Sequence, residues 1–150
     1  MSIIEKTKKI KAIVFDVDGV LTDGGIIYDN TGMEIKRFNV KDGQIISHLK
    51  KAGFIVGAIT GRDEEIAYIG DDIIDLSILT RCGLSATLND VRAYIKENVD
   101  LILPTNGGDG VLRDLADYIL QEQGLLKDIN FKNIEIAIKE IQKIKDLRAY

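Results

Sequence analysis

The chain has 150 residues, of which 45% are hydrophobic and 29% charged, and its formal net charge is −4 at pH 7. This length is sufficient for one domain with a substantial core, and the acidic balance argues against a general nucleic-acid-binding surface. The single cysteine, Cys82, excludes an internal disulfide framework, and no secretory signal or membrane-spanning apolar run is evident. We therefore expect a cytoplasmic protein with neither a nucleic-acid nor a membrane partner.

The first predicted element is an apolar strand over residues 12–16, and two short extended segments follow it, over 25–29 and 34–39. The turn signal Asp29-Asn30-Thr31-Gly32 separates these two segments and predicts a β-hairpin. This hairpin could be an ordinary edge of its own subunit or a contact with another subunit. A helix is then expected over about 42–52.

The rest of the chain alternates between strand and helix patterns. We expect strands over 54–60, 66–70, 84–87 and 100–103, and helices over 72–82, 90–98 and 111–122. This alternation predicts an α/β fold with a Rossmann-like parallel sheet and flanking helices, in a single domain over residues 1–150. Residues 133–147 place five isoleucines among lysines and glutamates, which predicts an amphipathic helix that packs on its own domain or on a partner.

Two carboxylates end the first strand. Asp16 and Asp18 lie two residues apart in a turn bounded by Gly19, and the turning chain allows both side chains to converge on one small volume. Like charges this close need a cation or a shared proton, which indicates a hard divalent metal such as Mg²⁺, acid/base chemistry, or both. A polar turn that uses Asp and Gly for their turn chemistry explains these residues equally well.

A second acidic cluster follows another apolar strand and contains Asp71, Asp72 and Asp75. Because ligands of open parallel sheets bind beyond the carboxyl ends of the strands, the two clusters predict one site. Between them, a further strand ends in Thr60-Gly61-Arg62, which offers a hydroxyl, an amide and a guanidinium to a phosphate. Metal-binding carboxylates beside an oxyanion pocket indicate phosphoryl transfer.

Five motifs stand in one order along the chain: Asp16-Val17-Asp18-Gly19-Val20-Leu21-Thr22-Asp23-Gly24, Phe38-Asn39-Val40-Lys41-Asp42-Gly43, Thr60-Gly61-Arg62, Tyr68-Ile69-Gly70-Asp71-Asp72-Ile73-Ile74-Asp75-Leu76 and Gly107-Gly108-Asp109-Gly110-Val111-Leu112-Arg113. Together they resemble the haloacid dehalogenase superfamily, and within it the small, capless 3-deoxy-D-manno-octulosonate 8-phosphate phosphatases, over residues 11–123. The resemblance implies a domain without a cap. It also implies Mg²⁺-dependent hydrolysis of a sugar-acid phosphate for lipopolysaccharide biosynthesis.

The resemblance implies a division of roles among the carboxylates. Asp16 would be the nucleophile that takes the phosphoryl group as an aspartyl phosphate, and Asp18 would protonate the leaving sugar oxygen and then activate water. Mg²⁺ would be held by Asp16, the main-chain carbonyl of Asp18, and Asp71. Asp72 or Asp75 would support the metal, either directly or from its outer shell.

Phosphate and substrate contacts are implied in the same way. Thr60 and the Gly61 amide would bind the transferring phosphoryl oxygens. Arg62, Lys41 and Arg113 are candidate contacts for the sugar acid. A solvated surface arginine is an equally good interpretation of Arg62 and of Arg113.

The resemblance further implies a homotetramer, in which the hairpin of one subunit, here residues 25–39, helps to close the site of another. A simple intramolecular edge is the competing interpretation of this segment.

One part of the family pattern is missing. That pattern places a helix, a strand with a phosphate-neutralising lysine and a second helix after the Thr-Gly-Arg motif, whereas only Asp63-Glu64-Glu65 separates Arg62 from Ile66. Parallel strands need a crossover of about a dozen residues, and the residues 61–65 reach only about 17 Å when extended. We therefore expect no ordinary parallel connection here. Either the sequence omits a segment, which we prefer, or a strand is exchanged between subunits, or the protein is a degenerate relative.

A non-catalytic module is the competing functional hypothesis. Receiver domains that accept a phosphoryl group also cluster aspartates at strand ends, and an assembly subunit could keep an acidic pocket without chemistry. The spacing of Asp16 and Asp18 favours the phosphatase, because a receiver needs no acid two residues beyond its phosphoryl acceptor.

Overall fold

A parallel sheet is the centre of the fold. The structure, a computed structural model, describes residues 1–57 and 63–127, and within this part five strands pair in the order β4-β1-β5-β6-β7. All four pairings are parallel, so the strands end at the same edge of the sheet. The strands are β1 (Ala12–Phe15), β4 (Ile55–Val56), β5 (Ile66–Ile69), β6 (Leu84–Thr87) and β7 (Leu101–Ile102). This arrangement confirms the predicted α/β fold with a parallel sheet.

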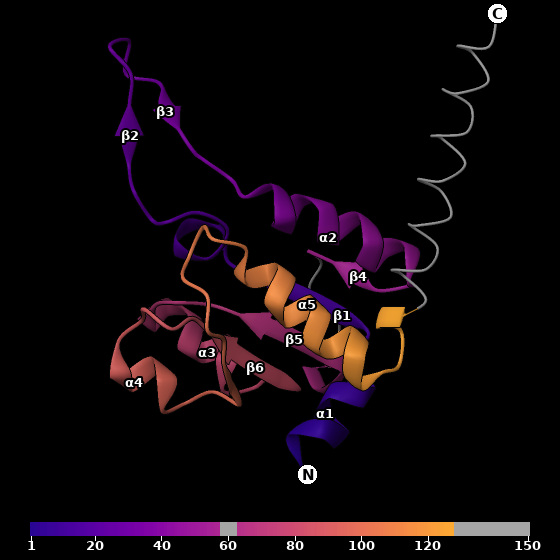
Figure 1. Cartoon of the computed structure of the whole chain (residues 1–150). Helices are drawn as coiled ribbons and strands as arrows, with labels where there is room; N and C mark the ends of the chain where they lie inside the picture. Colours follow the sequence, from indigo (N-terminus) through magenta and orange to yellow (C-terminus); the bar gives the residue numbers. More distant parts are fainter. Residues whose placement is uncertain (58–62, 128–150) are drawn as a thin grey trace, which may run out of the picture.

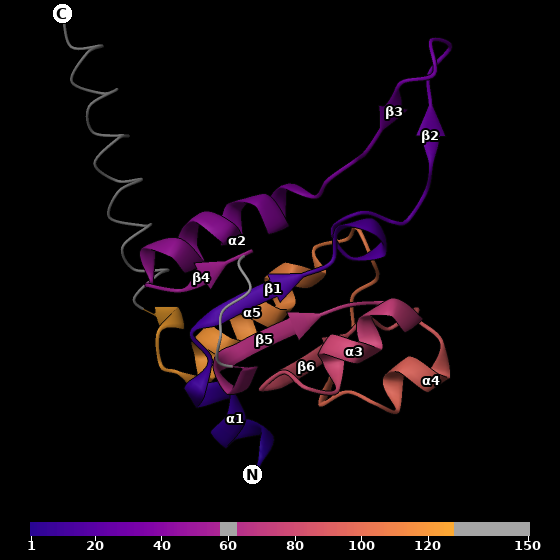
Figure 2. The ribbon, with the colours of Figure 1, turned by 180° about the vertical axis from the view of Figure 1, so that it is seen from behind.

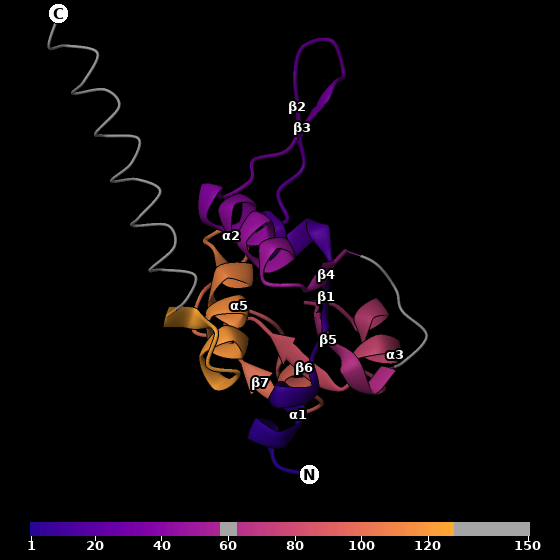
Figure 3. The same ribbon diagram turned by 90° about the vertical axis from the view of Figure 1, so that its right-hand side faces the viewer.

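Helices cover both faces of this sheet. Helices α2 (Val40–Lys51) and α5 (Val111–Glu122) pack against each other on one face, and the short turn η3 (Ile73–Asp75) continues into α3 (Leu76–Leu79) on the other. Figure 3 shows α5 and α3 on opposite sides of the sheet, and Figure 2 shows β1 lying between β4 and β5. Helix α4 (Ala93–Lys96) connects β6 to β7.

The central strands and α5 form the core. All four residues of β5 are buried, which explains why its sequence is continuously apolar rather than alternating. Leu112, Leu115 and Ile119 of α5 have no exposed surface and pack on the sheet. Their spacing of three and four residues places them on one face of the helix, which the sequence analysis predicted over the same residues, 111–122.

A helix that was not predicted, α1 (Ile3–Lys9), precedes β1. The Ser2 hydroxyl accepts a hydrogen bond from the Glu5 N–H at 3.3 Å, and the Glu5 carboxylate accepts one from the Ser2 N–H at 2.8 Å. These two bonds form a capping box, whose Ser-x-x-Glu pattern is visible in the sequence. The Gln123 amide donates to two carbonyl oxygens at the end of α1 and ties this helix to the end of α5.

The predicted hairpin is present and projects away from the rest of the fold (Figure 1). Strands β2 (Ile27–Tyr28) and β3 (Glu34–Ile35) pair in antiparallel fashion. The Asp29 carboxylate accepts hydrogen bonds from the N–H groups of Thr31 and Met33, at 2.8 and 2.9 Å, and so fixes the turn between them.

Several predicted elements are shorter than expected, among them both hairpin strands and β7. β4 ends at Val56, because Gly57 follows it with φ of +78°, outside the extended region, and residues 58–60 of the predicted strand lie outside the described residues. The helix predicted over 72–82 is a 3₁₀ turn followed by α3, which ends at residue 79, and the one predicted over 90–98 is reduced to α4.

The connection between β4 and β5 differs from the predicted one. Both strands pair in parallel with β1, so the prediction that no ordinary parallel connection could join them is wrong. The reason is the early end of β4: Val56 pairs at the level of Ile13 and Ile66 at the level of Ala12. The chain therefore returns by one strand position, about 3.3 Å, and crosses one intervening strand, about 10 Å. Residues 57–65 are long enough for this path.

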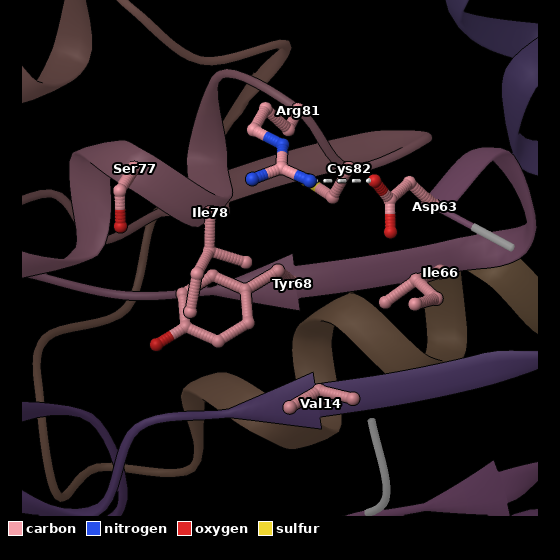
Figure 4. A pocket seen from close by; sticks show the side chains of 8 residues that line it. All are labelled: Val14, Asp63, Ile66, Tyr68, Ser77, Ile78, Arg81 and Cys82. Carbon is pink, nitrogen blue, oxygen red and sulfur yellow. Dashed lines mark hydrogen bonds and ion pairs between the residues drawn. The ribbon is translucent and has the colours of Figure 1, made fainter. Parts of the chain in front are cut away.

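Beside this connection, the sheet face next to α3 is hollowed. A cavity of about 200 Å³ lies between β1, β5 and α3, and an ion pair between Arg81 and Asp63 at 3.3 Å borders it (Figure 4). The cavity is lined by Val14, Asp63, Ile66, Tyr68, Ser77, Ile78, Arg81 and Cys82. Helix α3 has only four residues, and its Ser77 and Ile78 form one wall of this cavity.

No helix within residues 1–57 and 63–127 combines the length and the apolarity needed to cross a membrane. The amphipathic helix predicted over 133–147 lies outside the described residues.

A substitution at Gly83 tests how the short connection packs. A Cβ atom there would lie 2.1 Å from the carbonyl oxygen of Glu64, in the 3₁₀ turn η2 (Asp63–Glu65) that precedes β5. We expect Gly83→Ala to lower the free energy of unfolding, measured by urea titration, by about 1–3 kcal/mol, because the backbone at Glu64 must move to make room for the new methyl group. The control Gly43→Ala lies at an exposed helical position, where the new Cβ would meet no described atom within 4 Å outside the backbone of its own helix. It should raise the free energy of unfolding by about 0.5–1 kcal/mol. A Gly83→Ala protein as stable as the wild type would contradict this packing.

Candidate active site

Three carboxylates meet at the carboxyl edge of the sheet. Asp16 directly follows β1, and Asp71 and Asp75 follow β5 in the neighbouring position. One oxygen of each carboxylate lies within 4.8 Å of the other two. The structure therefore brings the two acidic clusters of the sequence together, as adjacent parallel strands require.

The turn after β1 is built around a glycine. The Asp16 N–H donates to the Ile69 carbonyl at 3.0 Å and so extends the pairing of β1 with β5 by one residue. Gly19 has φ of +93°, and a Cβ atom on it would lie only 2.0 Å from Oδ2 of Asp71. Glycine is therefore required here for two reasons, the left-handed backbone and the close approach of the Asp71 carboxylate.

Asp75 is held in place by three donors. Its Oδ1 accepts a hydrogen bond from the Tyr68 hydroxyl at 2.6 Å, and its Oδ2 accepts bonds from the N–H groups of Asp71 and Asp72, both at 3.0 Å. Both oxygens of this buried carboxylate are thus engaged by the protein. Asp75 therefore orients the acidic loop, whereas the carboxylates of Asp16 and Asp71 keep oxygen atoms that could coordinate a metal ion.

The electrostatics of the cluster favour a cation. Burial, together with the charges of Asp75 and Asp16, raises the pKa of Asp71 to about 6. Burial is also the main cause that raises the pKa of Asp16. Oδ1 of Asp71 is buried and has no hydrogen-bond partner among the described residues. An orphaned carboxylate oxygen among three converging acids fits a hard divalent ion such as Mg²⁺.

Two of the sequence-predicted acids lie outside this cluster. The Asp18 carboxylate accepts hydrogen bonds from Nζ of Lys36 at 2.7 and 2.8 Å, and its side chain is 63% exposed. The Asp72 carboxylate caps η3 by accepting the Ile73 N–H at 2.6 Å. Neither side chain belongs to the cluster that Asp16 forms with Asp71 and Asp75.

The remaining candidates divide into two groups. Thr60, Gly61 and Arg62 lie outside the described residues. Lys41 is exposed at the start of α2, and Nε of Arg113 donates to Asp117 within α5 at 2.7 Å.

The loop before α5 closes against the β1 turn. The Gly108 N–H donates to the Val20 carbonyl at 3.0 Å, and the Asn39 side chain donates to the Gly108 carbonyl at 3.1 Å. A Cβ atom on Gly107 would lie 2.0 Å from the Gly19 carbonyl oxygen. The second and fifth sequence motifs therefore support the first one structurally, which explains their glycines.

Sequence reasoning missed two side chains that act on the predicted acids. Tyr68 stands two residues before Gly70, so strand alternation alone could have placed it near the acidic loop. Lys36 is separated from Asp18 by 18 positions and reaches it only because the hairpin returns the chain, which no local pattern indicates.

Comparison with known proteins agrees with this geometry. A family model of haloacid dehalogenase-like hydrolases matches residues 58–115. The 3-deoxy-D-manno-octulosonate 8-phosphate phosphatase of Haemophilus influenzae is 36% identical over 158 positions, which cover 80% of this chain and 88% of that protein. Because 80% of this chain is about 120 residues, about 38 aligned positions have no residue here.

Solved structures show the same relationship. The enzyme of that name from Moraxella catarrhalis, in complex with magnesium, phosphate and 3-deoxy-D-manno-octulosonate (KDO), superposes with a TM-score of 0.80 at 28% identity, covering 87% of this chain and 97% of that one. The cobalt-bound phosphatase from Haemophilus influenzae gives 0.72 at 35% identity, covering 81% and 93%. The chain belongs to the 3-deoxy-D-manno-octulosonate 8-phosphate phosphatase family of haloacid dehalogenase-like hydrolases.

Proposed function

We propose that this protein is a Mg²⁺-dependent phosphomonoesterase that hydrolyses 3-deoxy-D-manno-octulosonate 8-phosphate to KDO and phosphate. The observation that carries the proposal is the convergence of Asp16, Asp71 and Asp75 at the tips of β1 and β5, in a chain of this family. The magnesium, phosphate and KDO bound to the Moraxella relative support the choice of metal and substrate. We place the activity in the cytoplasm, in lipopolysaccharide biosynthesis.

In the first step, Asp16 acts as the nucleophile. A carboxylate oxygen of Asp16 attacks the phosphorus, and the bond from phosphorus to the sugar oxygen breaks. Asp18 gives its proton to that leaving oxygen, so that KDO departs as the neutral alcohol. The phosphoryl group is then bound covalently to Asp16 as an aspartyl phosphate.

In the second step, water replaces the sugar. Asp18, now a carboxylate, takes a proton from water as the water oxygen attacks the phosphorus of the aspartyl phosphate. The bond from phosphorus to the Asp16 oxygen breaks, which releases inorganic phosphate and restores both acids. Thr60 and the Gly61 amide are our candidates for holding the phosphoryl oxygens.

Asp16, Asp71 and the main-chain carbonyl of Asp18 are our candidate ligands for Mg²⁺, and Asp75 supports them through its hydrogen bonds to the acidic loop. When bound, Mg²⁺ neutralises charge on the phosphoryl group and keeps the nucleophile ionised.

Two features of the family are proposed for the rest of the chain. The hairpin carries exposed apolar side chains, with Ile26 73% and Tyr28 63% exposed, which supports its packing on a neighbouring subunit of a homotetramer. Lys41, Arg62 and Arg113 remain candidate contacts for the sugar acid.

A catalytically degenerate relative is the second candidate function. The observation that favours it is the set of about 38 family positions without a residue in this chain. We infer that they correspond to the segment that this sequence lacks between Arg62 and Ile66. Turnover decides between the candidates, because a phospho-accepting module would hold a stable aspartyl phosphate.

Replacing the nucleophile tests the proposed function directly. We expect Asp16→Asn to lower the rate of phosphate release from 3-deoxy-D-manno-octulosonate 8-phosphate by at least about 10³-fold, because the amide cannot form the intermediate. Asp90→Asn, which removes an exposed carboxylate outside the site, should keep the wild-type rate. Normal turnover by Asp16→Asn would remove Asp16 from the mechanism.

The raised pKa of Asp71 predicts a pH-dependent metal affinity. Asp71 must lose its proton to bind Mg²⁺, and its pKa is about 6. The affinity measured by calorimetry should therefore be constant above about pH 7 and fall by up to about tenfold per unit below pH 6. Asp71→Asn should abolish both the binding and this dependence. An affinity that stays constant from pH 8 to pH 5 would contradict the assignment of Asp71 as a ligand.

The hairpin proposal predicts a change in assembly. Tyr28→Ser removes an exposed aromatic ring from the hairpin and should lower the molar mass measured by light scattering. Tyr94→Ser, which removes an aromatic ring that is 46% exposed on α4, serves as the matched control and should leave the mass unchanged. If both variants keep the wild-type mass, Tyr28 does not stabilise the assembly.

A further inference from the structure

Lys36 lies against the proposed acid/base of the reaction. It follows β3 in the hairpin, and its ammonium group contacts both carboxylate oxygens of Asp18, at 2.7 and 2.8 Å. Glu34 lies 3.5 Å from the same ammonium group and holds it from the hairpin side. Among the ion pairs of the described residues, this is the one that brings a cation to the Asp16-x-Asp18 turn.

The proposed reaction needs positive charge at this place. Asp16, Asp71 and Asp75 converge within 4.8 Å, and the phosphate monoester brings about two further negative charges. The two positive charges of one Mg²⁺ do not balance the negative charge of three carboxylates and a phosphate, so the carboxylates would still repel the phosphate. The family pattern places a segment with a phosphate-neutralising lysine after Arg62. In this chain only residues 63–65 stand there, and all three have acidic side chains.

The Lys36 contact with Asp18 is suited to exchange. Both side chains are partly exposed, 35% for Lys36 and 63% for Asp18, so their ion pair is screened by solvent and contributes little to stability. Asp18 is only two residues from Asp16 in the turn after β1, so this contact brings the ammonium group to the turn that carries the nucleophile. A phosphate beside Asp16 would therefore lie within the electrostatic reach of the same ammonium group.

We propose that Lys36 transfers from Asp18 to the phosphoryl oxygens when substrate binds, and so acts as the phosphate-neutralising cation of this chain. The inference rests on the proposed function. This transfer has two consequences. The ammonium group compensates the charge of the phosphate, and the Asp18 carboxyl group becomes free to reach the leaving oxygen. The exchange involves only hydrogen bonds, and no proton leaves Lys36.

Phosphate binding tests the proposal without requiring turnover. In the full-length protein with saturating Mg²⁺, we expect Lys36→Met to raise the dissociation constant of inorganic phosphate at least about tenfold and to lower kcat/KM by about 10²–10³-fold. Lys36→Arg, which keeps the charge, should recover most of both losses. Arg37→Met is the matched control, because Arg37 is the neighbouring cation and pairs with Asp23 at 3.4 Å instead. It should stay within twofold of the wild type.

A double variant separates direct contact from an effect through Asp18. If Lys36 binds phosphate itself, Lys36→Met must weaken phosphate binding also in the Asp18→Asn background. Loss of the effect in that background, or wild-type phosphate affinity of Lys36→Met, would overturn the proposal. Phosphate binding that depends on Lys36 in a protein without turnover would support the role of Lys36 while refuting the proposed hydrolysis, so the two failures are distinguishable.

Discussion

Mutual repulsion of three carboxylates is the constraint on which the site depends. Asp16, Asp71 and Asp75 are brought within 4.8 Å of one another by the ends of two adjacent strands, in a setting where burial already disfavours their charged forms. The fold tolerates this arrangement because Tyr68 and two backbone N–H groups compensate Asp75. Asp71 keeps one buried oxygen without a hydrogen-bond partner in the part of the chain that the structure describes. A divalent cation resolves that imbalance and, in doing so, creates a centre that attracts phosphate.

The surrounding structure can be understood as support for this centre. Gly19 admits the Asp71 carboxylate, and Gly107 and Gly108 let the loop before α5 close on the β1 turn. These contacts join the first, second, fourth and fifth motifs of the sequence into one edge of the sheet. The hairpin adds Lys36 to the same edge from outside the sheet, where its contact with Asp18 is weak enough to be exchanged.

Much of this could be predicted from the sequence, because strand periodicity and chain order determine which acids share an edge. The parallel sheet, the hairpin, helix α5 and the meeting of the acidic clusters followed from such patterns. Tertiary effects explain the failures. β4 ends early at Gly57, so a nine-residue connection can join two parallel strands that the longer predicted strand would have kept apart. Lys36 reaches Asp18 through the hairpin, and no local pattern encodes that contact.

The central claim is that the β1 and β5 tips hold one divalent cation. Crystals of the full-length protein grown with Mn²⁺ in place of Mg²⁺ would test it through anomalous scattering. The account predicts one strong peak within about 2.0–2.3 Å of carboxylate oxygens of both Asp16 and Asp71. A fully ordered site without a peak between these two side chains, or a peak coordinated only by other residues, would contradict it.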